Sequence, residues 1–165
     1  MTGRILIADG VPTNRIVLRV KLTSAFYDVQ QASSGAEALA LIRQERPDLV
    51  IASADLPDME AEAFCSALQA SAGLADMPLI LLQRQTDPQA RMAALAAGAE
   101  DVLGPQADDG VLLARLRSLL RDAHAEDELR LREDTRRALG LAEAPRAFET
   151  PPQVVIVPMG PLRGL

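Results

Sequence analysis

The sequence predicts an α/β domain built on a five-stranded parallel sheet with helices on both faces. Over residues 1–122, short aliphatic runs alternate five times with amphipathic segments of helical period. This alternation is typical of βαβ units joined by right-handed crossovers. The 165-residue chain is 48 % hydrophobic but only 2 % aromatic. Such an aliphatic composition suits helices packed on a parallel sheet, because parallel strands are buried on both faces.

Five strands are expected, and the second is the most polar of them. We expect that strand at an edge of the sheet, where burial is less complete. The side chains that follow the strands should gather at one edge, since the carboxyl ends of parallel strands meet there. The predicted strands are Arg4–Ala8, Tyr27–Gln31, Asp48–Ala52, Met77–Gln83 and Asp101–Leu103.

Five helices are expected after these strands, over residues 13–25, 33–46, 60–71, 87–98 and 108–122. Thr13 is the expected N-cap of the first helix, Ser34 lies near the start of the second, and Gly98 closes the fourth. Helical spacing predicts apolar faces for the first and fifth helices. These faces comprise Ile16, Val17, Val20 and Leu22 in the first, and Leu112, Leu113, Leu116, Leu119 and Leu120 in the fifth.

The charge and cysteine content restrict the possible partners and compartment. The net charge is −6 with a pI near 4.8, so we expect no binding to nucleic acid or to anionic membranes. The single cysteine, Cys65, excludes an intramolecular disulfide and fits a reducing compartment. No run of residues has transmembrane length, and the N-terminus lacks the apolar segment of a signal peptide. We therefore expect a cytoplasmic protein.

The character of the chain changes after residue 122. Residues 123–152 are predicted to form a charged helical connector, which could extend the fifth helix, followed by a Pro-rich linker. The heptad pattern is too thin to predict a coiled coil. Residues 153–165 begin with a strand-like run at Val154–Val157. An isolated strand has no partner, so this segment is interpreted as the first strand of a truncated second domain.

Six stretches of the sequence carry a family resemblance. They are "RILIADGVPTNRIVLRVKL", "FYDVQQASSGAEALALI", "RPDLVIASADLPDMEAEAFCSAL", "MPLILL", "ALAAGAEDVLGP" and "DDGVLLARLRSLLRD". Over roughly residues 3–122 the chain resembles the receiver domain of response regulators. In particular it resembles the N-terminal receiver of PleD-type proteins, which carry two receivers and a GGDEF diguanylate cyclase domain. The resemblance implies the flavodoxin-like (CheY-like) fold, and it places the second receiver where residues 153–165 begin.

Receiver chemistry, as the resemblance implies, needs two acidic residues after the first strand and a phosphoacceptor aspartate on the third, which together hold Mg²⁺. It also needs a hydroxyl after the fourth strand and a lysine after the fifth, because the transferring phosphoryl group is anionic. Here the acidic pair is reduced to Asp9 beside Gly10, and the phosphoacceptor position is Ser53. Only one of the five chemical groups remains, so the Mg²⁺ site is expected to be lost.

The other positions of the degenerate pocket follow from the same resemblance. Gln83 stands at the hydroxyl position, and Pro105 with Gln106 replaces the Lys-Pro pair. Val102 stands at the aromatic switch position of the fifth strand. No GGDEF motif is present, so no enzymatic activity is expected of these residues.

Several residues offer alternative chemistry. Asp55 could replace Ser53 as the acceptor after a register slip, or a kinase could phosphorylate Ser53 itself. His124 could suggest phosphotransfer, but it lies in a charged helical segment and is interpreted as solvated. Cys65 is expected at or near the core. On the fifth helix, the basic face is either solvated or meets a partner; it comprises Arg115, Arg117 and Arg121.

The sequence therefore favours a pseudo-receiver that is not phosphorylated and acts as a regulatory adaptor or dimerisation module. Its partner would be a signalling protein or a second copy, bound through the fourth and fifth helices or the charged tail. The module would lie N-terminal to a diguanylate cyclase. The alternatives are a receiver that autophosphorylates on Asp55 or Asp9, and a stand-alone scaffold.

Overall fold

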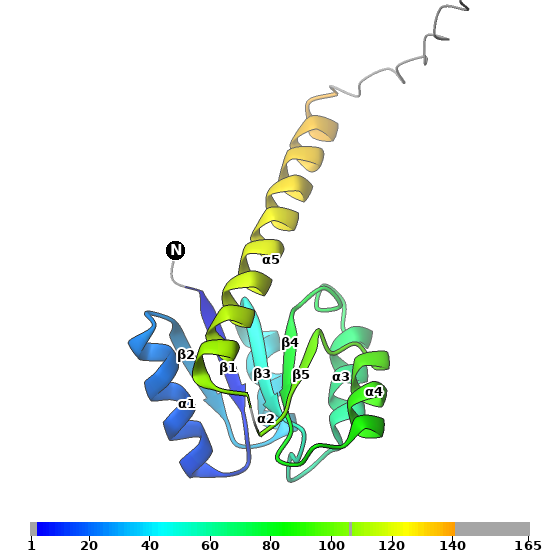
Figure 1. Ribbon diagram of the computed structural model, residues 1–165. Coiled ribbons are helices and arrows are strands. Elements are labelled where there is room, and N and C mark those ends of the chain that lie inside the picture. The colour runs from blue at the N-terminus through cyan, green and yellow to red at the C-terminus, as the bar shows by residue number, and fades with distance from the viewer. Residues whose placement is uncertain (1–2, 106, 141–165) are drawn as a thin grey trace, which may run out of the picture. The chain divides into compact units, whose positions relative to one another are not determined.

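A computed structural model describes residues 3–105 and 107–140 and confirms the α/β fold (Figure 1). All strands of the five-stranded sheet pair in parallel, in the order β2-β1-β3-β4-β5. The polar second strand does lie at an edge. The strand order reverses between β1 and β3, which is where open α/β sheets place their binding crevices. The strands are β1 Arg4–Ala8, β2 Asp28–Ala32, β3 Leu49–Ser53, β4 Leu79–Leu82 and β5 Asp101–Leu103.

Helices follow each strand, and the fifth continues past residue 122 to Ala138, which is the extension that the charged connector could form. Its charged residues beyond 122 are helical, because they are rich in good helix formers. The helices are α1 Pro12–Ser24, α2 Gly35–Gln44, α3 Ala61–Ala70, α4 Pro88–Ala96 and α5 Asp109–Ala138. The chain divides into two units, Met1–Glu128 and Leu129–Leu165. The strand predicted at Val154–Val157 and the linker before it lie outside the described residues.

Two apolar clusters cover the two faces of the sheet. On one face α1 and α5 pack against alternate strand residues, among them Ile5, Ile7 and Ile51 (Figure 1). On the other face α2, α3 and α4 pack against Leu6 and Val50 and their neighbours. The leucine stripe predicted for α5 is confirmed: Leu112, Leu116 and Leu120 are buried, and Leu113 and Leu119 pack against them.

The helix ends agree with the predicted caps at two of three positions. The Ser34 hydroxyl accepts a hydrogen bond from the Glu37 amide and so caps α2. Gly98 follows α4 with a φ of +112°, a conformation that glycine adopts without strain. The predicted Thr13 cap is wrong. Helix α1 begins at Pro12 after Val11, which makes no side-chain cap, because proline at the first helical position sets the helical φ in advance.

The predicted apolar face of α1 is also wrong in part. Leu22 is fully buried, but Ile16 and Val20 are each 60 % exposed. Two polar contacts fix the rotation of this helix. Asn14 and Arg15 donate hydrogen bonds to Asp9 at the end of β1, which turns the Leu18–Leu22 row toward the sheet and the Ile16–Val20 row toward solvent. Val17, the fourth predicted residue, is exposed as well.

One non-glycine residue among those described adopts a left-handed backbone conformation. Phe26, in the turn between α1 and β2, has a φ of +68° and is 80 % exposed. Its amide donates a hydrogen bond to the Thr23 carbonyl, which closes the turn. A bulky side chain is strained in this region of φ.

Candidate functional site

The central strands place Asp9 and Ser53 next to each other at the carboxyl edge of the sheet. Ala8 pairs with Ala52 in the register of β1 and β3, and Asp9 and Ser53 directly follow this pair. Both are almost completely buried, with 4 % and 3 % of their surface exposed. Ser53 is the last residue of β3, one residue beyond the predicted end of that strand at Ala52.

A cavity of about 360 Å³ opens beside these two residues. Four of the six residues assigned to the degenerate pocket line it: Asp9, Ser53, Gln83 and Pro105. The other two do not. Gly10 packs against the Pro57 ring, where an added Cβ would lie 3.0 Å from Cδ. Val102 is fully buried within the apolar cluster beneath α2, α3 and α4.

The Asp9 carboxylate is held by neutral donors from the start of α1. The Val11 amide donates to Oδ1 at 2.8 Å, and Asn14 Nδ2 donates to Oδ2 at 3.1 Å. The Arg15 guanidinium donates to the Asp9 backbone carbonyl at 2.6 Å rather than to the carboxylate. Both carboxylate oxygens are therefore already hydrogen-bonded within the β1–α1 turn.

The Ser53 hydroxyl has a local role. Its Oγ accepts a hydrogen bond from the Asp55 amide at 3.2 Å, which stabilises the turn that leaves β3. No carboxylate or imidazole hydrogen-bonds this hydroxyl within the part of the chain that the structure describes. A serine without an adjacent base is a weak nucleophile.

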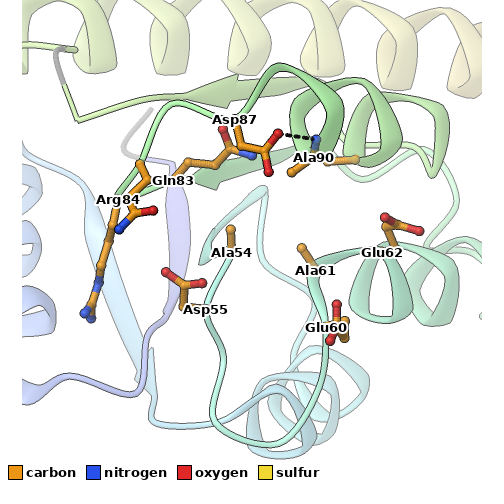
Figure 2. Close-up of a pocket in the computed structure, with 11 residues that line it drawn as sticks. Ala54, Asp55, Glu60, Ala61, Glu62, Gln83, Arg84, Asp87 and Ala90 are labelled. Atoms are coloured by element: carbon orange, nitrogen blue, oxygen red, sulfur yellow. Dashed lines mark hydrogen bonds between the residues drawn. The ribbon is translucent and has the colours of Figure 1, made fainter.

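Asp55 lines a second cavity, of about 480 Å³, that lies between the β3–α3 and β4–α4 loops (Figure 2). Asp55 and Glu60 come from the first loop, while Arg84 and Asp87 come from the second. Asp87 is committed to capping α4, since it accepts hydrogen bonds from the Gln89 and Ala90 amides. Asp55 is exposed and lines this second cavity, and it does not line the cavity that holds Asp9.

Two cationic side chains line the cavity beside Asp9. Lys21 on α1 is ion-paired with Asp109 at the start of α5, at 2.6 Å. Arg84 lines both cavities, and no described residue pairs with it. The position after β5 holds the uncharged Pro105, so neither cation takes the place of a lysine there.

The donor atoms around Asp9 do not fit a Mg²⁺ ion. Magnesium needs several oxygen ligands in octahedral geometry, commonly from carboxylates. Here the Asp9 carboxylate is already hydrogen-bonded and stands beside a serine hydroxyl and an amide. The other two carboxylates that line the cavity are also engaged, because Asp108 accepts the Val111 amide and Asp109 pairs with Lys21. Across the described ranges, no three His, Cys, Asp or Glu side chains lie close enough together to hold a metal ion.

The matching family is described as the response regulator receiver domain, and the match covers residues 5–117. The chain belongs to this family. Two response regulators are similar to this chain in sequence. Response regulator PleD from Caulobacter vibrioides is 34 % identical over 141 residues, which is 86 % of this chain and 31 % of PleD. Response regulator MprA from Mycobacterium ulcerans is 34 % identical over 128 residues, which is 78 % of this chain and 54 % of MprA. The chain therefore spans about a third to a half of these relatives.

Solved receiver structures confirm the fold. The receiver domain of a histidine kinase from Syntrophus aciditrophicus superposes with a TM-score of 0.68 at 31 % identity, covering 73 % of this chain and 92 % of that one. The chemotaxis response regulator CheY4 of Vibrio cholerae gives a TM-score of 0.67 at 26 % identity, with coverages of 72 % and 99 %. No helix in the described part of the chain is both long and apolar enough to cross a membrane.

The receiver holds an ion-pair cluster around the buried Asp101 that the sequence did not reveal. Asp101, the first residue of β5, accepts a hydrogen bond from the Val102 amide at 2.8 Å and pairs with Arg115 Nε at 2.7 Å. Arg91 on α4 lies 3.8 Å from Asp101 and donates to the Val102 carbonyl at 3.0 Å. Together Arg91, Asp101 and Arg115, here called the β5 clamp, join α4, β5 and α5. The only signal in the sequence was an acidic residue at the start of an otherwise apolar strand.

A second missed contact fixes the loop after β3. Asp58 accepts hydrogen bonds from the Ala36 and Gly35 amides at the start of α2, at 2.9 and 2.8 Å. These bonds lower the pKa of Asp58 below its ordinary value. Just before α2, the Ser33 hydroxyl and amide donate to the Glu37 carboxylate and lower its pKa in the same way. The β3–α3 loop is thereby held against the N-terminus of α2.

The remaining candidates lie away from Asp9 and Ser53. Cys65 on α3 is buried, as expected, and burial raises the pKa of its thiol to about 11. His124 is exposed on α5. The three arginines that the sequence grouped on the fifth helix separate in the structure, because Arg115 belongs to the β5 clamp, whereas Arg117 and Arg121 line a different hollow.

Proposed function

We propose that this receiver is a pseudo-receiver that is not phosphorylated. The observation that carries the proposal is the buried serine at the end of β3. Ser53 is buried beside Asp9, and the family resemblance assigns it the position of the phosphoacceptor aspartate. A hydroxyl in this position carries no negative charge, accepts the Asp55 amide and has no base, so it does not attack a phosphodonor.

The charges around Ser53 support the same proposal. Phosphoryl transfer depends on cations that neutralise the developing negative charge. Gly10 stands in place of a second acid and Pro105 in place of a lysine, and the one ammonium group that lines the cavity, Lys21, is paired with Asp109. We therefore infer that the receiver binds no Mg²⁺ in this pocket.

The function that remains is regulation through binding. We propose that the receiver acts in the cytoplasm as an adaptor or dimerisation module of a two-component signalling protein. Its state is then set by the partner, because a ligand shifts conformers only through its differential affinity for them. The β5 clamp supports a fixed α4–β5–α5 surface for such a partner, either another signalling protein or a second copy.

The similarity to PleD supports a specific setting. The sequence resembles the N-terminal receiver of a diguanylate cyclase, and PleD is 34 % identical over 141 residues. We propose that residues 123–152 connect this receiver to a second receiver and a cyclase that produces cyclic di-GMP. Sequencing of the gene beyond Leu165 tests this setting directly, and a GGDEF motif downstream is the expected result.

Intact-mass measurement tests the absence of phosphorylation. The protein is incubated with acetyl phosphate and Mg²⁺, and we expect no phosphoryl adduct. Two variants, Asp55→Asn and Asp9→Asn, assign any adduct that does form. A stoichiometric adduct that disappears in Asp55→Asn would establish the alternative, an active receiver with a displaced acceptor.

Sedimentation measurements test the dimerisation part of the proposal. The chain ending at residue 122 is compared with the chain that includes the charged tail. We expect the longer chain to self-associate more strongly. Monomers at all concentrations for both chains would remove self-association and leave the adaptor function alone.

A further inference from the structure

A hollow of about 430 Å³ lies at the opposite edge of the sheet from Ser53, next to the start of β1. Helix α5 forms one wall, and the turn before β2 forms the other. The strand ends meet there because the Asp28 amide donates to the Gly3 carbonyl. The lining residues are Gly3, Tyr27, Ala114, Arg117, Leu120, Arg121 and His124.

The floor of this hollow is apolar. Leu120 is buried and packs in the cluster that joins α5 to the sheet, with the Tyr27 ring against the same cluster. Gly3 lies directly against this floor, since a Cβ there would lie only 3.1 Å from Leu120 Cδ1 and 3.7 Å from Tyr27 Cδ1. The hollow above the floor, between α5 and Tyr27, has the volume to hold an apolar side chain.

The rim of the hollow is cationic. Arg117, Arg121 and His124 lie at helical spacings of four and three residues, so their side chains share one side of α5. No described residue forms an ion pair or hydrogen bond with any of them, and no Asp or Glu lines the hollow. Arg115, by contrast, faces β5 and is paired with Asp101.

We propose that this hollow, with its rim of Arg117, Arg121 and His124, binds an acidic segment of a partner protein that carries one large apolar side chain. Charge complementarity selects this occupant. The chain has a net charge of −6, yet no acidic side chain lines this hollow, so a negatively charged partner is attracted here and repelled by most of the remaining surface. The apolar floor adds a pocket for an anchor side chain.

The C-terminal part of this chain is a weaker candidate for the same place. Residues 141–165 contain two Glu and two Arg and therefore carry no net charge. The inference is independent of whether Ser53 is phosphorylated, because the hollow shares no residue with the cavity at the other edge of the sheet.

A titration followed by ¹⁵N–¹H NMR tests the proposal on the full chain. The probe is a short polyglutamate peptide with one central leucine. We expect it to shift the amides of Gly3, Tyr27, Arg117 and Arg121, and to do so less without the leucine. The same peptide with lysine in place of glutamate should shift none of them.

Two matched charge reversals separate site binding from general attraction. Arg117→Glu/Arg121→Glu should weaken peptide binding by about tenfold or more. Arg43→Glu/Arg46→Glu changes the net charge equally on exposed residues of the region around the end of α2, and should leave the affinity within about twofold. Thermal melts confirm that both variants fold.

Several outcomes would overturn the proposal. One is the absence of amide shifts at millimolar peptide, and another is equal weakening by the two double variants. Shifts at the same amides that grow with protein concentration alone would assign the hollow to a second copy. Co-sedimentation with phosphatidylserine vesicles that exceeds peptide binding and is lost in Arg117→Glu/Arg121→Glu would assign it to a membrane surface.

Discussion

The β5 clamp predicts an asymmetry between its two main partners. Asp101 is the buried member, with 7 % of its side chain exposed, whereas Arg115 is 55 % exposed. Replacing Arg115 by Met keeps the apolar stem but leaves a buried carboxylate with only the Val102 amide and the distant Arg91. Replacing Asp101 by Asn instead leaves an arginine that water can reach.

The magnitudes follow from these exposures. Removing one partner of a fully buried pair costs about 3–5 kcal/mol. Because Arg115 is half exposed, water reaches the vacated position and reduces the cost of Arg115→Met to about 2 kcal/mol. Asp101→Asn loses a charge-assisted hydrogen bond but can retain the bond from the Val102 amide, and it should cost about 1 kcal/mol. In the double variant no unpaired buried charge remains, so its cost should be close to that of Asp101→Asn alone.

Urea unfolding of the wild type, the two single variants and the double variant measures all these values in one thermodynamic cycle. A coupling free energy between Asp101 and Arg115 of about 1–2 kcal/mol is expected. The reasoning would be refuted if Asp101→Asn were the costlier single change. It would also fail if the two effects were additive, since the residues would then not interact.

Three further predictions concern pH, reactivity and packing. The folded pKa of Asp58 lies below its unfolded value of about 3.8. The stability that the ionised Asp58 carboxylate contributes should therefore be complete above that pH and be lost as the pH falls through the folded pKa. The free energy of unfolding measured against pH should show this loss in the wild type and not in Asp58→Asn. Cys65, with its pKa near 11, should resist a thiol reagent at pH 8 in the native protein and react readily in urea; rapid native labelling would show that α3 opens. Because Ile16 is exposed, Ile16→Gln should change the free energy of unfolding by less than about 0.5 kcal/mol. Because Leu22 is buried, Leu22→Ala should lower it by about 2–5 kcal/mol. Similar costs for the two variants in urea unfolding would contradict the observed rotation of α1.

The sheet was predictable because its signals are local. Aliphatic runs, the Ser34 cap and Gly98 each report on a few neighbouring residues, and the structure confirms them. The rotation of helix α1 cannot be predicted from such local signals. It contains two apolar rows at helical spacing, and the choice between them depends on hydrogen bonds from Asn14 and Arg15 to Asp9, which lies on a different element.

Some residues of the candidate site could likewise be predicted from the sequence, and others could not. Asp9, Ser53, Gln83 and Pro105 could be predicted to meet because each follows a parallel strand, and all four line one cavity. Val102 does not join them because it lies within β5 rather than after it, and alternate residues of a strand face opposite sides of the sheet: Val102 packs on the side of α2, α3 and α4, and Leu103 on the other. The β5 clamp joins residues from three elements, and no pattern within a single element reveals such a contact.

The turn at Phe26 shows how much conformational cost this domain tolerates. A left-handed backbone costs a non-glycine residue roughly 1–2 kcal/mol, and an aromatic ring exposed to water recovers little of that through packing. The domain stays folded because α1 and β2 are anchored on either side of the turn, by Leu22 in the core and by the pairing of Asp28 with Arg4. Stability in this receiver is therefore sufficient rather than maximal, and the turn between its first helix and second strand can vary in sequence without endangering the fold.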